Sequence, residues 1–205
     1  MSEKRKKGKT IVISICVLAI AYFVYNGLHN RSANQNSSGI LHPDWLTYTS
    51  ITHGFSIKYP KEYTVNSDYI YEENVPGMSI PGVSFAIPTE KYAGTNFVEG
   101  YISTEIIRNP SSCKAEGFLD AENKIVGTKT INNMEFSTAE GTGVGAGQYY
   151  NETIYATLHG TACFGFRLFL HTGNITMYDP GTVIQFDPKE ANTIFEDMVK
   201  TAKLP

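Results

Sequence analysis

The sequence predicts an α+β domain, an antiparallel β-sheet with packed helices, preceded by one N-terminal transmembrane helix. Short runs that alternate apolar and polar residues dominate the chain from about residue 45, as expected for strands with one buried face. Near the C-terminus the apolar spacing changes to that of an amphipathic helix. An apolar stretch without charge lies between Lys9 and Arg31. Strands followed by a closing helix are typical of α+β domains.

The composition limits the class of protein. The chain has 205 residues, and 41% of them are hydrophobic, which is enough to bury a sizeable core and excludes wholesale disorder. The net charge is -3 and the pI about 6.0, so bulk electrostatics argue against nucleic acid as a partner.

The N-terminus predicts a membrane anchor. Residues 1–9 hold five basic residues and one acidic residue, and residues 10–28 follow with no charge. A 19-residue helix spans roughly 28 Å, about one hydrocarbon core. The excess of basic residues before the span predicts that residues 1–9 are a cytoplasmic tail and that the rest of the chain is outside. A cleaved signal peptide is the alternative, but the apolar run continues past Ala21 to Tyr25, which favours a retained anchor.

Beyond the anchor, the small and polar residues 29–44 predict a flexible linker. Residues 45–205 then form one extracytoplasmic domain. We expect its strands at 55–59, 83–87, 100–108, 124–130, 134–139, 149–158 and 161–170, with turns at Asn132-Asn133 and His159-Gly160.

Two helices complete the domain. Asp187 as N-cap, Pro188 at the first helical position and Glu190 as the capping-box acid predict the start of the closing helix. Its apolar stripe consists of Ala191, Ile194, Phe195, Met198 and Ala202. We expect a shorter helix over 112–119.

Cys113 and Cys163 are predicted to form a disulfide. Cys16 lies within the anchor, so these two make an even pair outside the membrane, where oxidation is favoured. The bridge would close a loop of about 50 residues, worth roughly 4 kcal/mol in the chain-entropy description. Two separate buried thiols are the alternative.

The start of the domain resembles that of PsbP-like domains. The resemblance rests on the run Gly54 to Pro60, GFSIKYP, followed by Tyr63-Thr64-Val65, and on the closing run Phe195 to Thr201. It covers residues 45–205 and implies an α-β-α sandwich around an antiparallel sheet. Characterised members are mostly non-enzymatic binding or assembly subunits, and many bacterial members are anchored surface proteins, so the resemblance implies a bacterial cell surface or periplasm.

The sequence shows no motif for catalysis, a metal or a cofactor, so we expect none of these. The glycine-rich run 141–147 superficially fits a dinucleotide fingerprint, but a strand follows it where that fingerprint needs a helix. A hairpin loop is the simpler interpretation. The five histidines have no metal-binding spacing, and no nucleophile motif is present.

One segment, 68–82, mixes acidic and large apolar residues with Pro and Gly, and it predicts a loop that binds a partner. The candidate partner-binding residues are Tyr69, Tyr71, Glu72, Glu73 and Met78. The alternative, which the sequence leaves open, is that the rings pack beneath the loop.

These observations favour a single-pass, membrane-anchored extracytoplasmic module that binds a protein partner or assembles a surface complex without catalysis. A surface carrier of a small ligand or lipid, with a pocket between sheet and helix, is the alternative. An enzyme is the third and least supported hypothesis.

Overall fold

A computed structural model describes residues 42–72, 79–119 and 124–205 of the chain. The chain divides into two units, residues 1–43 and 44–205, and all the elements given below belong to the second unit. The predicted tail and transmembrane helix lie outside the described residues, as does most of the predicted linker. Within the described ranges, no helix combines the length and the apolar character needed to cross a membrane.

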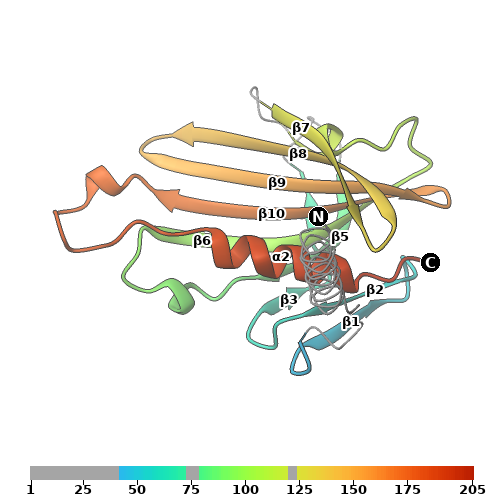
Figure 1. The fold of residues 1–205 in the computed structure, drawn as a ribbon, viewed down its shortest axis with the longest axis horizontal. Helices are drawn as coiled ribbons and strands as arrows, with labels where there is room; N and C mark the ends of the chain where they lie inside the picture. Colours follow the sequence, from blue (N-terminus) through green and yellow to red (C-terminus); the bar gives the residue numbers. More distant parts are fainter. Residues whose placement is uncertain (1–41, 73–78, 120–123) are drawn as a thin grey trace, which may run out of the picture. The chain divides into compact units, whose positions relative to one another are not determined.

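An antiparallel sheet of eight strands forms the centre of the domain (Figure 1). The strand order is β3-β5-β6-β10-β9-β8-β7, and β4 also pairs with β5. The strands are β3 (Thr64–Asn66), β4 (Ile70–Tyr71), β5 (Ile80–Ala86), β6 (Phe97–Arg108), β7 (Lys124–Ile131), β8 (Met134–Gly145), β9 (Gln148–His159) and β10 (Ala162–Gly173). The predicted α+β class, a mainly antiparallel sheet with a C-terminal helix, is therefore confirmed.

The turns between the long strands follow the predicted pattern with two corrections. Asn132 and Asn133 both have positive φ, as a two-residue hairpin turn requires, and join β7 to β8. The turn between β9 and β10 lies at Gly160-Thr161, one residue later than predicted, because His159 still pairs with Ala162. The glycine-rich run is not a loop, since β8 continues to Gly145 and a two-residue turn leads into β9.

One face of the sheet, here called the helix face, is covered by α2 (Lys189–Thr201). A separate hairpin of β1 (Leu46–Ser50) and β2 (Phe55–Tyr59) joins this layer, because Ser56 exchanges backbone hydrogen bonds with Lys203 after the helix. The core between sheet and helix is rich in aromatic and aliphatic side chains, including Phe55, Ile102, Phe164, Phe166, Leu168, Phe195 and Met198.

The start of α2 follows the predicted cap in part. The Asp187 carboxylate accepts the backbone N–H of Lys189 at 3.0 Å, and Pro188 precedes the helix in helical backbone geometry. Glu190 forms an ion pair with Lys91 at 3.0 Å, so this acid connects α2 to the short helix η1 (Thr89–Tyr92).

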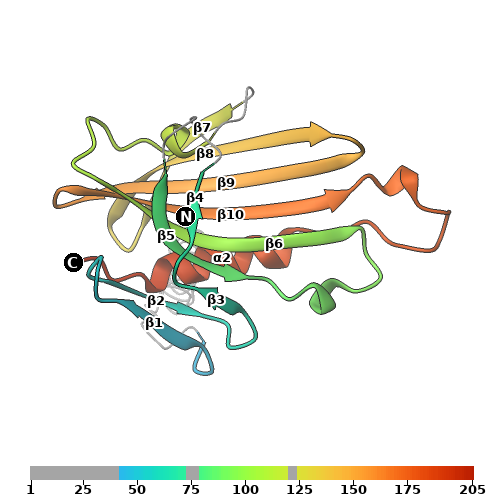
Figure 2. The same cartoon turned by 180° about the vertical axis from the view of Figure 1, so that it is seen from behind.

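The second face of the sheet, opposite α2, is covered by less secondary structure than the helix face (Figure 2). The helix expected over 112–119 is one 3₁₀ turn, η2 (Ala115–Phe118), because Lys114 is extended and Gly117 disfavours a longer helix. A further 3₁₀ turn, η3 (Ile175–Met177), follows β10. Within the described ranges, α2 is the one α-helix, so the second helical layer of the expected α-β-α sandwich is not found there.

Candidate functional site

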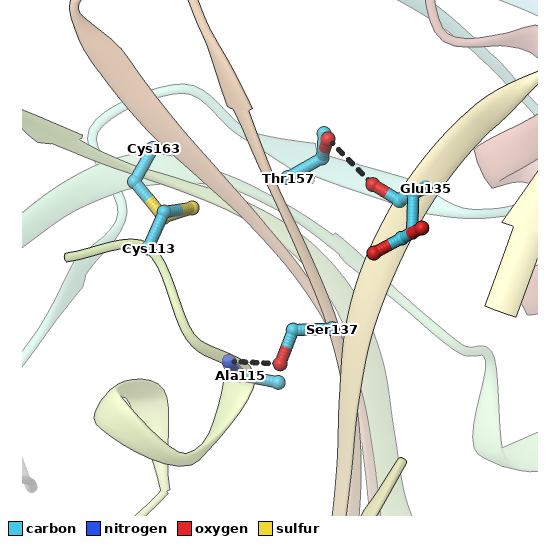
Figure 3. Close-up of a disulfide and its surroundings, with 6 residues drawn as sticks. All are labelled: Cys113, Ala115, Glu135, Ser137, Thr157 and Cys163. Carbon is cyan, nitrogen blue, oxygen red and sulfur yellow. Dashed lines mark hydrogen bonds between the residues drawn. A yellow bond between two sulfur atoms is a disulfide. The ribbon is translucent and has the colours of Figure 1, made fainter. Parts of the chain in front are cut away.

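The predicted disulfide between Cys113 and Cys163 is present, with Cα atoms 5.4 Å apart (Figure 3). It joins the segment before η2 to β10, where Cys163 is fully buried. The backbone N–H of Ala115 donates to Ser137 Oγ on β8 at 3.0 Å. Together these two connections fix η2 on the second face of the sheet.

A buried ion cluster lies next to η2 on this face. The side chains of Arg167 on β10 and Glu105 on β6 are both fully buried. Arg167 Nε donates to Glu105 Oε1 at 2.7 Å, and Nη2 donates to Oε2 at 2.9 Å, so the pair is bidentate. The guanidinium also donates to the Glu152 carboxylate and to the carbonyl oxygen of Phe118. Burial lowers the pKa of Arg167, but hydrogen bonding and the charges of Glu105 and Glu152 hold it well above the usual value.

Two of the predicted partner-binding residues, Tyr69 and Tyr71, pack against this cluster. The Arg167 guanidinium lies 3.7 Å from the centroid of the Tyr71 ring, a cation–π contact. The Tyr69 hydroxyl lies 3.3 Å from both Glu105 Oε1 and the Tyr101 hydroxyl. Burial raises the pKa of Tyr69 and Tyr71 well above the usual range. Burial also raises the pKa of Tyr101 to about 12, although the hydrogen bond with Tyr69 and the charge of Arg167 lower it.

The packing alternative describes Tyr71, which is only 4% exposed, whereas Tyr69 is half-buried. Both rings pack against the ion cluster. Glu72 is exposed, whereas Glu73 and Met78 lie outside the described residues. A partner-binding role for this segment stays a prediction.

A different surface on the second face has the features of a binding site. Four rings, here called the aromatic row, stand side by side across β6, β10 and β9: Tyr101, Phe169, Tyr150 and His171. Successive ring centroids lie 4.9, 6.3 and 4.6 Å apart, and the planes differ by 21–30°. All four are only half-buried. Figure 2 shows that no described helix or strand crosses the half of this face toward the β8–β9 turn.

Strand β8 lies beside the aromatic row and has glycine at alternate positions on the same face. Gly143 pairs with Tyr150, and Gly145 pairs with Gln148. A Cβ atom at Gly145 would meet nothing within 4 Å, and one at Gly143 would make only ordinary contacts with Tyr150. The packing of the described residues therefore does not require glycine at either position, and the β8 backbone is accessible from outside.

Polar contacts fix the end of the aromatic row. The His171 Nδ1 atom lies 3.2 Å from Glu99 Oε1, and Nε2 lies 2.8 Å from Gln148 Oε1. The surface thus combines aromatic rings, an amide and carboxylates over an accessible strand.

The helix face carries two adjoining cavities between the sheet and the segment that leads into α2. One has a volume of about 290 Å³ and lies against Leu168, Leu170 and Phe186. The other, of about 310 Å³, extends toward Tyr149 and Ile175. Asn151, Thr172 and Gln185 line both.

The far wall of these cavities is held by Asn96, which is buried. Its Nδ2 donates to the Gly173 carbonyl at 2.5 Å, and its Oδ1 accepts the Phe186 N–H at 2.7 Å. The cavities therefore belong to the fixed architecture of the domain.

No metal site emerges from the described ranges, which contain no group of three or more His, Cys, Asp or Glu side chains able to hold an ion. His53 lies 3.4 Å from Arg108, and burial followed by that positive charge lowers its pKa. His159 contacts the Pro205 carbonyl at the end of the chain.

Comparison with known proteins gives similarities of fold. No protein-family model and no curated protein matches the chain. Similar solved structures include cyanobacterial PsbP from Synechocystis sp. PCC 6803, with 12% identity and a TM-score of 0.44 over 84% of this chain and 99% of that one. Another is a protein from Bacteroides thetaiotaomicron VPI-5482, with 15% identity and a TM-score of 0.48 over 79% of this chain. The chain spans about half, 49%, of that protein. A PsbP structure is thus among the similar structures, as the sequence resemblance implied, and neither similarity bears on function.

The ion cluster, the aromatic row and the cavities were not predicted from the sequence. A usable signal for the cluster was present, because Arg167 interrupts the apolar run of β10, and such a charge is rarely buried unless paired. The aromatic row depends on the register between β6, β9 and β10, which the sequence alone does not determine.

Proposed function

We propose that this protein is a single-pass, membrane-anchored extracytoplasmic module that binds a protein partner without catalysis. The binding surface in this proposal is the open half of the second face. The aromatic row beside the accessible glycines of β8 is the observation that carries it. Half-exposed aromatic side chains are enriched at protein interfaces. Glycine inside a strand is unfavourable and often marks a place where a ligand or another backbone approaches closely.

The charge of the domain favours a basic partner. Residues 44–205 contain 11 basic and 19 acidic residues. At the surface itself, Glu99 borders the aromatic row, and the cluster beside it places two carboxylates around one guanidinium. Such a field steers a basic segment toward the site and repels an acidic one.

The proposed location rests on two supports. The uncharged span 10–28 after a basic tail predicts an anchor with the domain outside. The disulfide between Cys113 and Cys163 suits an oxidising compartment. External protease on intact cells should then remove the domain, and protection until lysis would contradict this topology.

Neighbouring tyrosines of β9 provide a matched test of the binding surface. Tyr150 belongs to the aromatic row, whereas Tyr149 points to the opposite face. In crosslinking on intact membranes, Tyr150→Ala should reduce partner capture at least tenfold, as expected for an interface anchor. Tyr149→Ala should leave capture unchanged. Equal capture by both variants, with melting temperatures near wild type, would place the interface elsewhere.

The alternative function is a carrier of a small ligand or lipid. The adjoining cavities of the helix face favour this alternative, because they lie between the sheet and the segment that leads into α2. Each is close to the lower end of the range for ligand sites, about 300–1,000 Å³.

A further inference from the structure

We propose that the two cavities of the helix face bind a neutral, hydroxyl-rich ring compound, a saccharide of one or two units. This inference rests on the alternative function above and is independent of partner binding on the second face. The residues of the cavity walls distinguish four classes of ligand: ionic compounds, saccharides, lipids and extended peptides.

The lining is polar but carries no charge. Among the described residues, the walls of the two cavities contain amide and hydroxyl side chains and no Asp, Glu, Lys, Arg or His. An ionic ligand would lose its hydration there without a counter-charge, which is unfavourable. Amides and hydroxyls both donate and accept, as the hydroxyl groups of a saccharide do. These polar side chains are Asn96, Tyr149, Asn151, Thr153, Thr172, Asn174, Gln185 and Asn192.

The wall also includes apolar area that suits the carbon-bound hydrogens of a sugar ring. Pro188 is exposed at one cavity, which is also lined by the almost fully buried side chains of Leu168, Leu170 and Phe186. An acyl chain needs a longer apolar channel than these surfaces provide, and it would leave the surrounding amides unpaired. A lipid therefore fits less well than a saccharide.

An extended peptide is disfavoured by the position of the strands. The cavities lie on β9 and β10, which are interior strands paired on both sides. Peptides that add to a sheet need the unpaired backbone of an edge strand. The ligand must therefore be recognised by side chains, as a compact neutral polyol would be.

The experiment uses the full chain in phospholipid nanodiscs, which avoids sugar-based detergents. The probes are glucose, N-acetylglucosamine, maltose and N,N′-diacetylchitobiose, with laurate and acetyl-arginine amide as the lipid and cation probes. Saturation-transfer NMR detects binding of each probe. At least one saccharide should bind, and the two non-saccharide probes should not compete for its site.

Two amide variants test the location. Asn151→Ala and Gln185→Ala each remove an exposed amide that lines both cavities, and each should weaken saccharide binding about fivefold, as for one net hydrogen bond. Gln148→Ala is the matched control, because it removes an amide from the same strand on the opposite face. Saccharide binding that all three variants retain, binding of laurate in its place, or no saccharide binding would overturn the inference. None of these results bears on partner binding at the second face, which the Tyr150→Ala variant tests separately.

Discussion

Arg167 shows how one residue organises the second face. Its guanidinium binds Glu105 in a bidentate pair, contacts Glu152 and the Phe118 carbonyl, and lies over the Tyr71 ring. It thereby connects β6, β9, β10, η2 and β4. A buried pair of this kind adds little net stability over apolar packing, but the loss of one partner leaves an uncompensated charge.

Arg167→Met should therefore be strongly destabilising. We expect a loss of about 3–5 kcal/mol, roughly 10 °C in melting temperature, because the Glu105 carboxyl group would be left buried without its partner. The double variant Arg167→Met with Glu105→Gln should recover a large part of that loss, since it leaves no buried charge from the bidentate pair. Thermal unfolding of both variants measures the loss and its recovery. A single variant that melts like wild type would show that the pair does not hold this face together.

At the scale of elements, the disulfide fixes η2 to the sheet. The bridge links residues 50 positions apart, so it restricts the unfolded chain strongly. It also places Phe118 beside Gly165, where a Cβ atom would lie 2.5 Å from the Phe118 ring. Only glycine fits at this close approach of η2 to β10.

The Cys113→Ala variant should lower the melting temperature by about 10 °C, which corresponds to roughly 4 kcal/mol. Cys163→Ala and the double variant should show nearly the same loss, because the bridge is lost only once. Additive losses from the two single variants would indicate that each thiol contributes by packing rather than by the bridge. Peptide mapping without reductant should recover the two peptides joined.

The alternate glycines of β8 give a prediction in which stability and binding diverge. Gly143→Val and Gly145→Val place β-branched side chains on an accessible strand where contacts allow them. Both should leave stability unchanged or raise it by about 0.5–1 kcal/mol, since glycine is unfavourable in a strand. Both should weaken partner capture, because the backbone is no longer approachable. Normal capture by both variants would remove the role proposed for these glycines.

At the scale of the whole molecule, the alternation of apolar and polar residues was enough to predict the class of fold. The strands beginning at Phe55 and Lys124 follow directly from that pattern, and the pair Asn132-Asn133 predicted the turn between β7 and β8. The short strands β1, β3 and β4 were missed, because they have few residues and depend on long-range pairing. The surfaces proposed for binding depend on register and on packing between distant segments, which local patterns do not contain.

Shielded tyrosines predict how the domain responds to alkaline pH. Burial is the largest cause that raises the pKa of Tyr92 and Tyr101 to about 12, and it raises those of Tyr63, Tyr69 and Tyr71 further. The unfolded chain loses these protons near pH 10. Between about pH 10 and 12 the unfolded state therefore binds fewer protons than the folded state. The contribution of these tyrosines to stability is thus constant well below pH 10 and is lost as the pH rises above 10.

The melting temperature measured from about pH 8 to 11 should be flat and then decline, and the tyrosinate absorbance that comes from the buried rings should appear only on unfolding. A melting temperature that stays constant through pH 11 would contradict the shielding of these rings.

The central claim is that the open half of the second face binds a basic partner outside the membrane. The most direct test replaces Tyr150 with the photoreactive p-benzoylphenylalanine in the full chain, since this residue keeps an aromatic ring within the aromatic row. Ile51, which is 95% exposed in the turn between β1 and β2, carries the same group as the control. Irradiation of intact membranes should crosslink position 150, and not position 51, to one protein through a segment rich in Lys or Arg. A crosslink from position 51 alone, or none from position 150, would contradict this claim.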